Sequence, residues 1–142
     1  MANVHESPVS ALLVGAYEWD RQLVQQIFSD SGWKLYEAQD RHRALRCLDR
    51  YPIDVVIAET NVADWGWRHV LRDLQDRRQQ AQLIVTSRHA DDRLWAEALN
   101  MGAFDVLAQP FDRKEVRRVV ESAHRHRSPA QSAGREIIAG AA

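Results

Sequence analysis

Glu59 stands where a side chain could take part in chemistry. It ends the segment Asp54–Glu59, in which three consecutive β-branched residues are typical of a short strand buried on both faces. Such strands occur in parallel sheets, where ligands meet the chain at the carboxyl ends of the strands. We therefore expect the function of the domain to be decided around Glu59.

Other reactive residue types are not arranged for catalysis. His42, His69 and His89 are scattered among polar residues, and no nucleophile–base pair is visible. The single Cys47 falls in an apolar helical pattern, which favours packing over redox chemistry. The turn Gly15–Trp19 lacks the Ser, Thr and Gly residues that cradle a cofactor phosphate. We expect neither an enzyme nor a bound cofactor.

Apolar runs and helical patterns alternate along the chain. The runs predict strands at residues 9–14, 33–38, 53–59, 83–87 and 104–108. The helical patterns predict helices at residues 19–31, 40–50, 67–78 and 91–101, and a last helix that follows Asp112. Asp40 is a suitable N-cap, and Gly32 and Gly102 stand where helices end. Connections this short favour right-handed crossovers, so the predicted class is a doubly wound α/β fold.

Three stretches carry a family resemblance. They are Thr86-Ser87 after the fourth strand, Gly102–Leu107 leading into the fifth strand, and Gln109-Pro110-Phe111 after it. Together with the alternation of strands and helices, they closely resemble the receiver domain of two-component response regulators, over residues 11–127. The resemblance implies a flavodoxin-like, five-stranded parallel sheet of order 2-1-3-4-5 with five helices, and a site at the carboxyl edge of the sheet.

The resemblance also implies which residues fill that site. Receiver domains place a phosphoacceptor Asp after strand three, two acids that help hold Mg²⁺ after strand one, and a Lys before a proline after strand five. The matching positions here are Glu59, the pair Gly15 and Ala16, and Gln109; the family's hydroxyl position keeps Thr86. Mg²⁺ requires several oxygen ligands, so we expect no metal site. The sequence predicts a degenerate phosphorylation site with one remaining carboxylate and no lysine.

Two interpretations of Glu59 stay open. Its longer side chain could reach the place of a phosphoryl group, attract the Thr86 hydroxyl and partly imitate the phosphorylated state. Alternatively, it is a solvated carboxylate at a strand end. Glu18 is better suited to a helix start than to the role of a replacement metal ligand.

Trp65 and Trp67 flank Gly66 next to the expected site. Two indole rings on a short loop could line a pocket for a small molecule, or they could simply pack over the site. The first possibility supports an alternative function for the chain, a flavodoxin-like module that binds a small molecule.

A protein interface is expected on the face formed by helix four, strand five and helix five, which receiver domains commonly use. The candidate contact residues are Trp95, Val106 and Arg118, and the expected partner is another protein or a second copy of the chain. The apolar residues of the segment 91–101 span a wide arc, broader than one buried stripe needs.

The composition points to an ordinary globular domain. The chain has 142 residues, 45% of them hydrophobic, and a formal net charge of −1. We expect no membrane span and a cytoplasmic location. Basic residues cluster between Arg113 and Arg127, but no DNA-binding module follows, so direct contact with nucleic acid is not expected.

The ends of the chain differ from its middle in composition. Residues 1–8 are expected to be a flexible N-terminus, residues 9–127 the receiver-like domain, and residues 128–142 a linker or disordered tail. The segment Glu136–Gly140 resembles the entry to the ATPase module of some transcription regulators. A second alternative is therefore the N-terminal fragment of a larger transcription regulator.

Overall fold

The computed structural model describes residues 8–62, 65–77 and 80–126. The main elements are β1 (Ser10–Val14), α1 (Glu18–Ser31), β2 (Lys34–Ala38), α2 (Arg41–Arg50), β3 (Val55–Glu59), α3 (Trp67–Asp76), β6 (Gln82–Ser87), α4 (Asp92–Met101) and β7 (Asp105–Ala108). A C-terminal helix at residues 113–126 follows β7. The short strands β4 (Asn61–Val62) and β5 (Trp65–Gly66) lie between β3 and α3.

Five strands form one parallel sheet in the order β2-β1-β3-β6-β7. Counting only these strands, the order is 2-1-3-4-5, which confirms the predicted flavodoxin-like class. β3 lies at the centre and pairs with β1 on one side and β6 on the other, with Ala58 beside Val14 and Glu59 beside Thr86. The carboxyl ends of the central strands therefore meet near Glu59.

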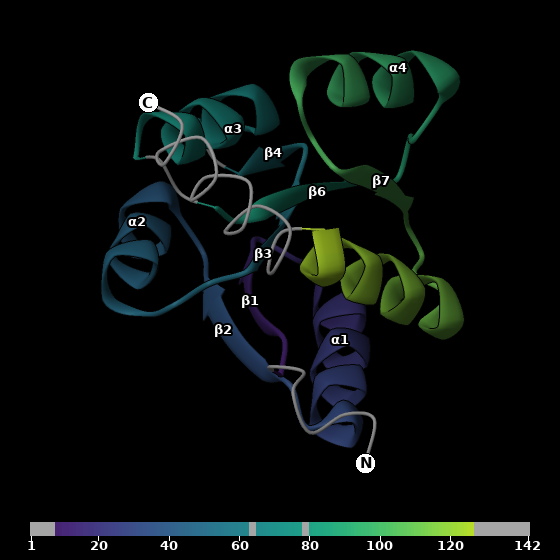
Figure 1. Cartoon of the computed structure of the whole chain (residues 1–142). Coiled ribbons are helices and arrows are strands. Elements are labelled where there is room, and N and C mark those ends of the chain that lie inside the picture. The colour runs from purple at the N-terminus through teal and green to yellow at the C-terminus, as the bar shows by residue number, and fades with distance from the viewer. Residues whose placement is uncertain (1–7, 63–64, 78–79, 127–142) are drawn as a thin grey trace, which may run out of the picture.

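Helices cover both faces of the sheet (Figure 1). One face packs against α1 and the C-terminal helix, through residues such as Phe28 and Val120. The other face packs against α2, α3 and α4, through residues such as Leu48, Leu74 and Ala98. Alternate residues of the buried strands feed the two cores, which explains why these strands are apolar throughout rather than alternating.

The helix ends follow from local chemistry. The carboxylate of Asp40 accepts a hydrogen bond from the backbone N–H of Arg43 at 2.9 Å, so the predicted N-cap of α2 is confirmed. Gly32 and Gly102 end α1 and α4 with φ of 70° and 114°, in the left-handed region that favours glycine. These three positions fix where the chain turns back to the sheet.

One structured segment was not predicted. β4 and β5 pair as a small antiparallel hairpin, with Val62 opposite Trp65, in a stretch that the sequence indicates as a loop. Two-residue strands are too short to show an alternating pattern, so nothing in the sequence marks them. The hairpin brings Val62 and Trp65 back over the carboxyl edge of the sheet.

No helix among the described residues is long and apolar enough to span a bilayer. The expected flexible N-terminus, apart from Pro8, and the expected tail at 128–142 lie outside the described residues.

Candidate functional site

Gln109 holds together two carboxylates at the carboxyl edge of the sheet. Its side-chain Nε2 donates to Asp20 Oδ2 and to Glu59 Oε1, each at 2.7 Å. Gln109 and Asp20 are buried, with 8% and 4% of their surface exposed, and Glu59 is half-buried. The three side chains come from β3, α1 and the residue after β7, so one amide links three separate elements.

Asp20 was missed by the sequence reasoning, and the prediction of one remaining carboxylate is wrong. Asp20 lies four residues before Val24 and seven before Ile27, both of which are buried. That helical spacing places Asp20 on the buried side of α1, and it is the signal that could have found it. Its Oδ1 also accepts a long hydrogen bond of 3.5 Å from the backbone N–H of Phe111.

The charge state of Glu59 is affected by this arrangement. Burial raises the pKa of the Glu59 carboxyl, and the nearby Asp20 charge raises it further, while the hydrogen bond from Gln109 and the charge of Arg88 act in the opposite direction. The net pKa is raised above its ordinary value. The Gln109 amide donates one hydrogen bond to each acid but places no positive charge beside them.

Gly15 occupies the position of one family acid, and Val62 closes the space beside it. Gly15 has φ of 56°, and a Cβ built there would lie 2.7 Å from Val62 Cγ2. Val62 itself is buried, with 6% of its surface exposed. Any side chain at position 15 would meet both an unfavourable backbone conformation and an apolar wall.

This corner does not fit Mg²⁺. A pocket of about 280 Å³ lies over it, and Glu59 is the one acid among the described residues that line it. Gly15 and Ala16 carry no side-chain oxygen, and the Gln109 amide nitrogen lies between the two carboxylates that remain. Mg²⁺ needs several oxygen ligands in octahedral geometry, which these residues do not supply.

Thr86 lies beside Glu59 in the sheet, but among the described residues its side chain makes no hydrogen bond to the Glu59 carboxylate. The residue is 2% exposed, and its backbone carbonyl accepts from the N–H of Thr60 at 3.0 Å. Within the described residues the structure records no hydrogen bond between the Thr86 hydroxyl and Glu59; Gln109 makes that contact instead. The hydrogen bond between Glu59 and Thr86, which only one of the two interpretations of Glu59 requires, is therefore not recorded among the described residues.

Trp65 and Trp67 are packing residues. Each is 4% exposed, and both belong to the core that covers the α2–α3–α4 face. The indole Nε1 of Trp65 donates to Asp73 Oδ2 at 2.8 Å, and Asp73 also accepts from the Arg41 guanidinium at 3.0 and 3.3 Å. The hairpin is thus fastened to α3 and α2. Of the two tryptophans, Trp67 also lines the groove between α3 and α4.

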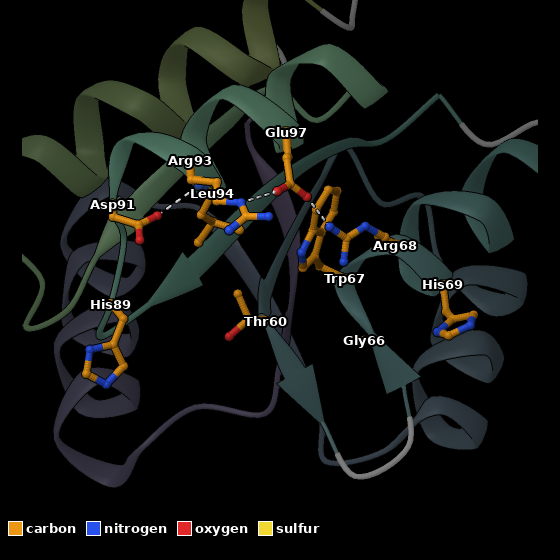
Figure 2. Close-up of a pocket in the computed structure, with 10 residues that line it drawn as sticks. All are labelled: Thr60, Gly66, Trp67, Arg68, His69, His89, Asp91, Arg93, Leu94 and Glu97. Carbon is orange, nitrogen blue, oxygen red and sulfur yellow. Dashed lines mark hydrogen bonds and ion pairs between the residues drawn. The ribbon is translucent and has the colours of Figure 1, made fainter.

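A groove of about 530 Å³ runs between the first turns of α3 and α4. Figure 2 shows Glu97 of α4 reaching both Arg68 and Arg93, and the Arg68 guanidinium lies 4.7 Å from the centre of the Trp67 ring. The cations at this groove are therefore already paired. In the part of the chain that the structure describes, no group of three or more His, Cys, Asp or Glu side chains is placed to hold a metal ion.

The expected interface residues have different surroundings. Trp95 is 49% exposed, and Leu99 and Met101 of the same helix are also exposed. Arg118 is exposed on the C-terminal helix. Val106 was a wrong choice, because it is 8% exposed and packs in the core beneath α4. Even though β7 is an edge strand, helices cover both of its faces. Among the described residues of α4, β7 and the C-terminal helix, the large exposed apolar side chains belong to α4.

Comparison with known proteins gives a consistent result. The family model for the response regulator receiver domain matches residues 12–121. The Regulatory protein AtoC of Escherichia coli (strain K12) is 24% identical over 103 residues, which are 72% of this chain and 22% of that protein. Sporulation initiation phosphotransferase F of Bacillus subtilis (strain 168) is 21% identical over 101 residues, 71% of this chain and 82% of that protein.

Solved structures agree with the fold. The signal receiver domain of an HD domain-containing protein from Pseudomonas fluorescens Pf-5 is 25% identical, with a TM-score of 0.75 over 85% of this chain and 98% of that one. Full-length FixJ from B. japonicum is 19% identical, with a TM-score of 0.78 over 87% of this chain and 61% of that one. Since the family model covers most of the chain and the sheet order agrees, the chain belongs to the response regulator receiver domain family.

Proposed function

We propose that this receiver domain signals through protein contact and is not controlled by phosphorylation of an aspartate at the sheet edge. The observation that carries the proposal is the bridge from Gln109 to Asp20 and Glu59, at the place where the family performs phosphoryl transfer. The last position of β3 holds Glu59 rather than Asp, and the position before Pro110 holds an amide rather than a lysine.

Phosphoryl transfer relies on a metal ion and positive groups that neutralise the charge developing on the phosphoryl oxygens. Gly15 and Ala16 bring no ligand for the metal, and the Gln109 amide brings no charge. The same amide ties α1, β3 and the end of β7 together. We propose that this bridge keeps the domain in one arrangement, in place of a switch between two.

The proposed output surface is the exposed apolar part of α4, formed by Trp95, Leu99 and Met101. Large apolar side chains gathered on one helix are typical of a protein contact surface. Arg118 of the C-terminal helix is a candidate for its charged rim. The partner is proposed to be a second copy of the chain or another signalling protein.

The absence of phosphorylation is tested directly with acetyl phosphate and Mg²⁺, using intact mass spectrometry. No added phosphoryl group is expected, while a receiver domain with the family's full set of acids and lysine becomes modified under the same conditions. An adduct of one phosphoryl group that is lost in base and kept in acid would refute the proposal, whichever carboxylate carries it.

The contact surface is tested with Trp95→Ala, and Trp19→Ala is a matched control. Trp19 is 76% exposed on α1, so its loss removes an equally large ring from a different surface. Trp95→Ala is expected to weaken self-association, or capture of a partner, by about tenfold, as for an interface residue that contributes 1–2 kcal/mol. Equal effects of the two substitutions would show that α4 is not the contact surface.

A further inference from the structure

The helix α2 carries a high positive charge for its length of ten residues. Its ten residues include four arginines against the single acid Asp49, a formal charge of +3, whereas the whole chain has a formal net charge of −1. Arg41 is occupied, since it pairs with Asp73. The other three arginines, Arg43, Arg46 and Arg50, follow one another at intervals of three and four residues, and so lie along one stripe of the helix.

These three arginines line a groove of about 410 Å³, together with Cys47, Asp49 and Tyr51. A volume of this size suits a small ligand. Cys47 and Tyr51 are half-buried and pack against the core, so the base of the groove is anchored. The Tyr51 ring is stacked on Tyr36 with 4.3 Å between the ring centres, which holds one wall in place.

The arginines of the groove are available to a ligand to different degrees. Among the described residues, no hydrogen bond or ion pair engages Arg46. Arg43 reaches Asp40 at 3.8 Å, a distance typical of a weak, exposed pair. The Arg50 guanidinium lies 5.8 Å from the centre of the Tyr51 ring, an interaction that leaves its N–H groups free to donate. Asp49, the one acid of the groove, is already paired with Arg77.

We propose that this groove binds a small molecule that carries two or more phosphate groups, of the nucleoside polyphosphate class. Arginine forks match phosphate oxygens in pairs of hydrogen bonds, which makes them the preferred side chains for this group. Arg43 and Arg50 are separated by about 10 Å along the helix, from a rise of 1.5 Å per residue, so the stripe suits a linear run of phosphates rather than a single one.

The charges around the groove favour a compact ligand over a nucleic acid. Asp40 stands at the start of α2, and Asp73 and Asp76 lie on the neighbouring helix α3. A long polyanion that followed α2 would meet these acids, and the net charge of the chain gives it no general attraction. The positive zone is therefore limited to the length of the stripe.

Cys47 makes the test direct, because the chain has one cysteine and it lines the groove. The rate at which Cys47 reacts with the neutral reagent 4,4′-dithiodipyridine is measured on the full chain with increasing ATP, without divalent metal. Saturable protection of the thiol at millimolar ATP or below is expected, and isothermal titration calorimetry should give the same Kd. Tripolyphosphate should protect, and adenosine should not.

Arg46→Glu is expected to weaken ATP binding by about tenfold, because it removes one bidentate contact and adds a repelling charge. Lys114→Glu is the matched control: it changes the net charge equally on the exposed surface of the C-terminal helix and should leave the Kd within about twofold. The proposal is overturned by absence of protection at millimolar ATP, by equal losses in the two variants, or by duplex DNA protecting Cys47 better than ATP.

Discussion

The corner of the sheet around Glu59 has an apolar half and a polar half, and they differ from the family's residue pattern in different ways. In the apolar half, Val62 packs against Gly15 so closely that no side chain fits there. In the polar half, two carboxylates remain and a neutral amide joins them. The first half leaves no room for a side-chain metal ligand at position 15, whereas the second keeps two acidic side chains beside an amide that carries no charge.

The largest effect is expected from Gly15→Ala, which breaks the apolar half. The new Cβ would lie 2.7 Å from Val62 and would hold φ of 56° in an unfavourable region. A positive φ at a residue other than glycine costs about 1–3 kcal/mol, and overpacking costs a similar amount. The free energy of unfolding, measured by urea denaturation, should therefore fall by about 3 kcal/mol.

Gly32→Ala separates these two causes. Gly32 also has positive φ, of 70°, but a Cβ there would meet no atom within 4 Å. It should therefore cost only the backbone part, about 1 kcal/mol. In addition, Val62→Ala should recover part of the loss in Gly15→Ala. If Gly15→Ala and Gly32→Ala cost the same, the contact with Val62 has no energetic weight.

A smaller loss is expected from Gln109→Leu, which breaks the polar half. Two buried or half-buried carboxylates would lose their shared donor, and unsatisfied groups of this kind cost about 1–3 kcal/mol. We expect the free energy of unfolding to fall by about 2 kcal/mol at neutral pH. The decrease should be smaller at pH 4, where Glu59 takes up a proton more easily. Gln109→Lys should instead raise the free energy of unfolding at neutral pH, since lysine supplies positive charge as well as hydrogen bonds to the two acids. A loss that is independent of pH would indicate a packing role for Gln109.

Asp73 supplies a reference carboxylate outside this corner. Burial alone would raise the pKa of its carboxyl, but hydrogen bonds from Arg41 and Trp65 outweigh burial, and the net pKa is lowered. Its stabilising contribution is therefore present above the ordinary pKa of Asp and is lost as the pH falls through the lowered value. Asp73→Asn should lower the free energy of unfolding by about 1 kcal/mol at pH 7, because Arg41 is largely exposed, and by progressively less as the pH falls below the ordinary pKa of Asp. Thermal unfolding across this pH range measures the difference.

Glu59→Gln should give the smallest change in the free energy of unfolding, and it should be an increase rather than a decrease. The folded state raises the Glu59 pKa, so the contribution of this group is fully present below its ordinary value of 4.5 and is lost as the pH rises through the raised value. Replacing the carboxylate by an amide should therefore stabilise the protein at pH 7, by no more than about 1 kcal/mol because the group is half exposed to water. Lower stability of Glu59→Gln at pH 7 would mean that the charge of Glu59 helps to hold the bridge.

The sequence predicts some of these features well because they are local. Continuous apolar runs mark the strands of a sheet covered on both faces, and Asp40, Gly32 and Gly102 mark helix ends by their own chemistry. Glu59 and Gln109 could be brought together because both follow strands of the same parallel sheet.

The features that the sequence does not predict depend on packing between elements that are distant in sequence. The burial of Asp20 is decided by the side of α1 that meets Gln109, 89 residues away. The position of Val62 depends on a hairpin of two-residue strands, and the burial of Val106 depends on α4 lying over an edge strand. Helical spacing indicates that Asp20 faces inward, but local periodicity does not show which element it meets, nor how the hairpin and α4 pack against the sheet. These three residues were therefore missed or misjudged.

The contact between Val62 and Gly15 also limits which substitutions this corner can accept. An acid at position 15, where the family places one, is blocked sterically as long as Val62 is present, and a smaller residue at position 62 brings no ligand by itself. Each of these two substitutions alone is therefore expected to lower the stability of the domain without supplying a metal ligand that it can use. A carboxylate can be introduced at position 15 only together with a change in the hairpin, so the two positions are coupled for any redesign of the site.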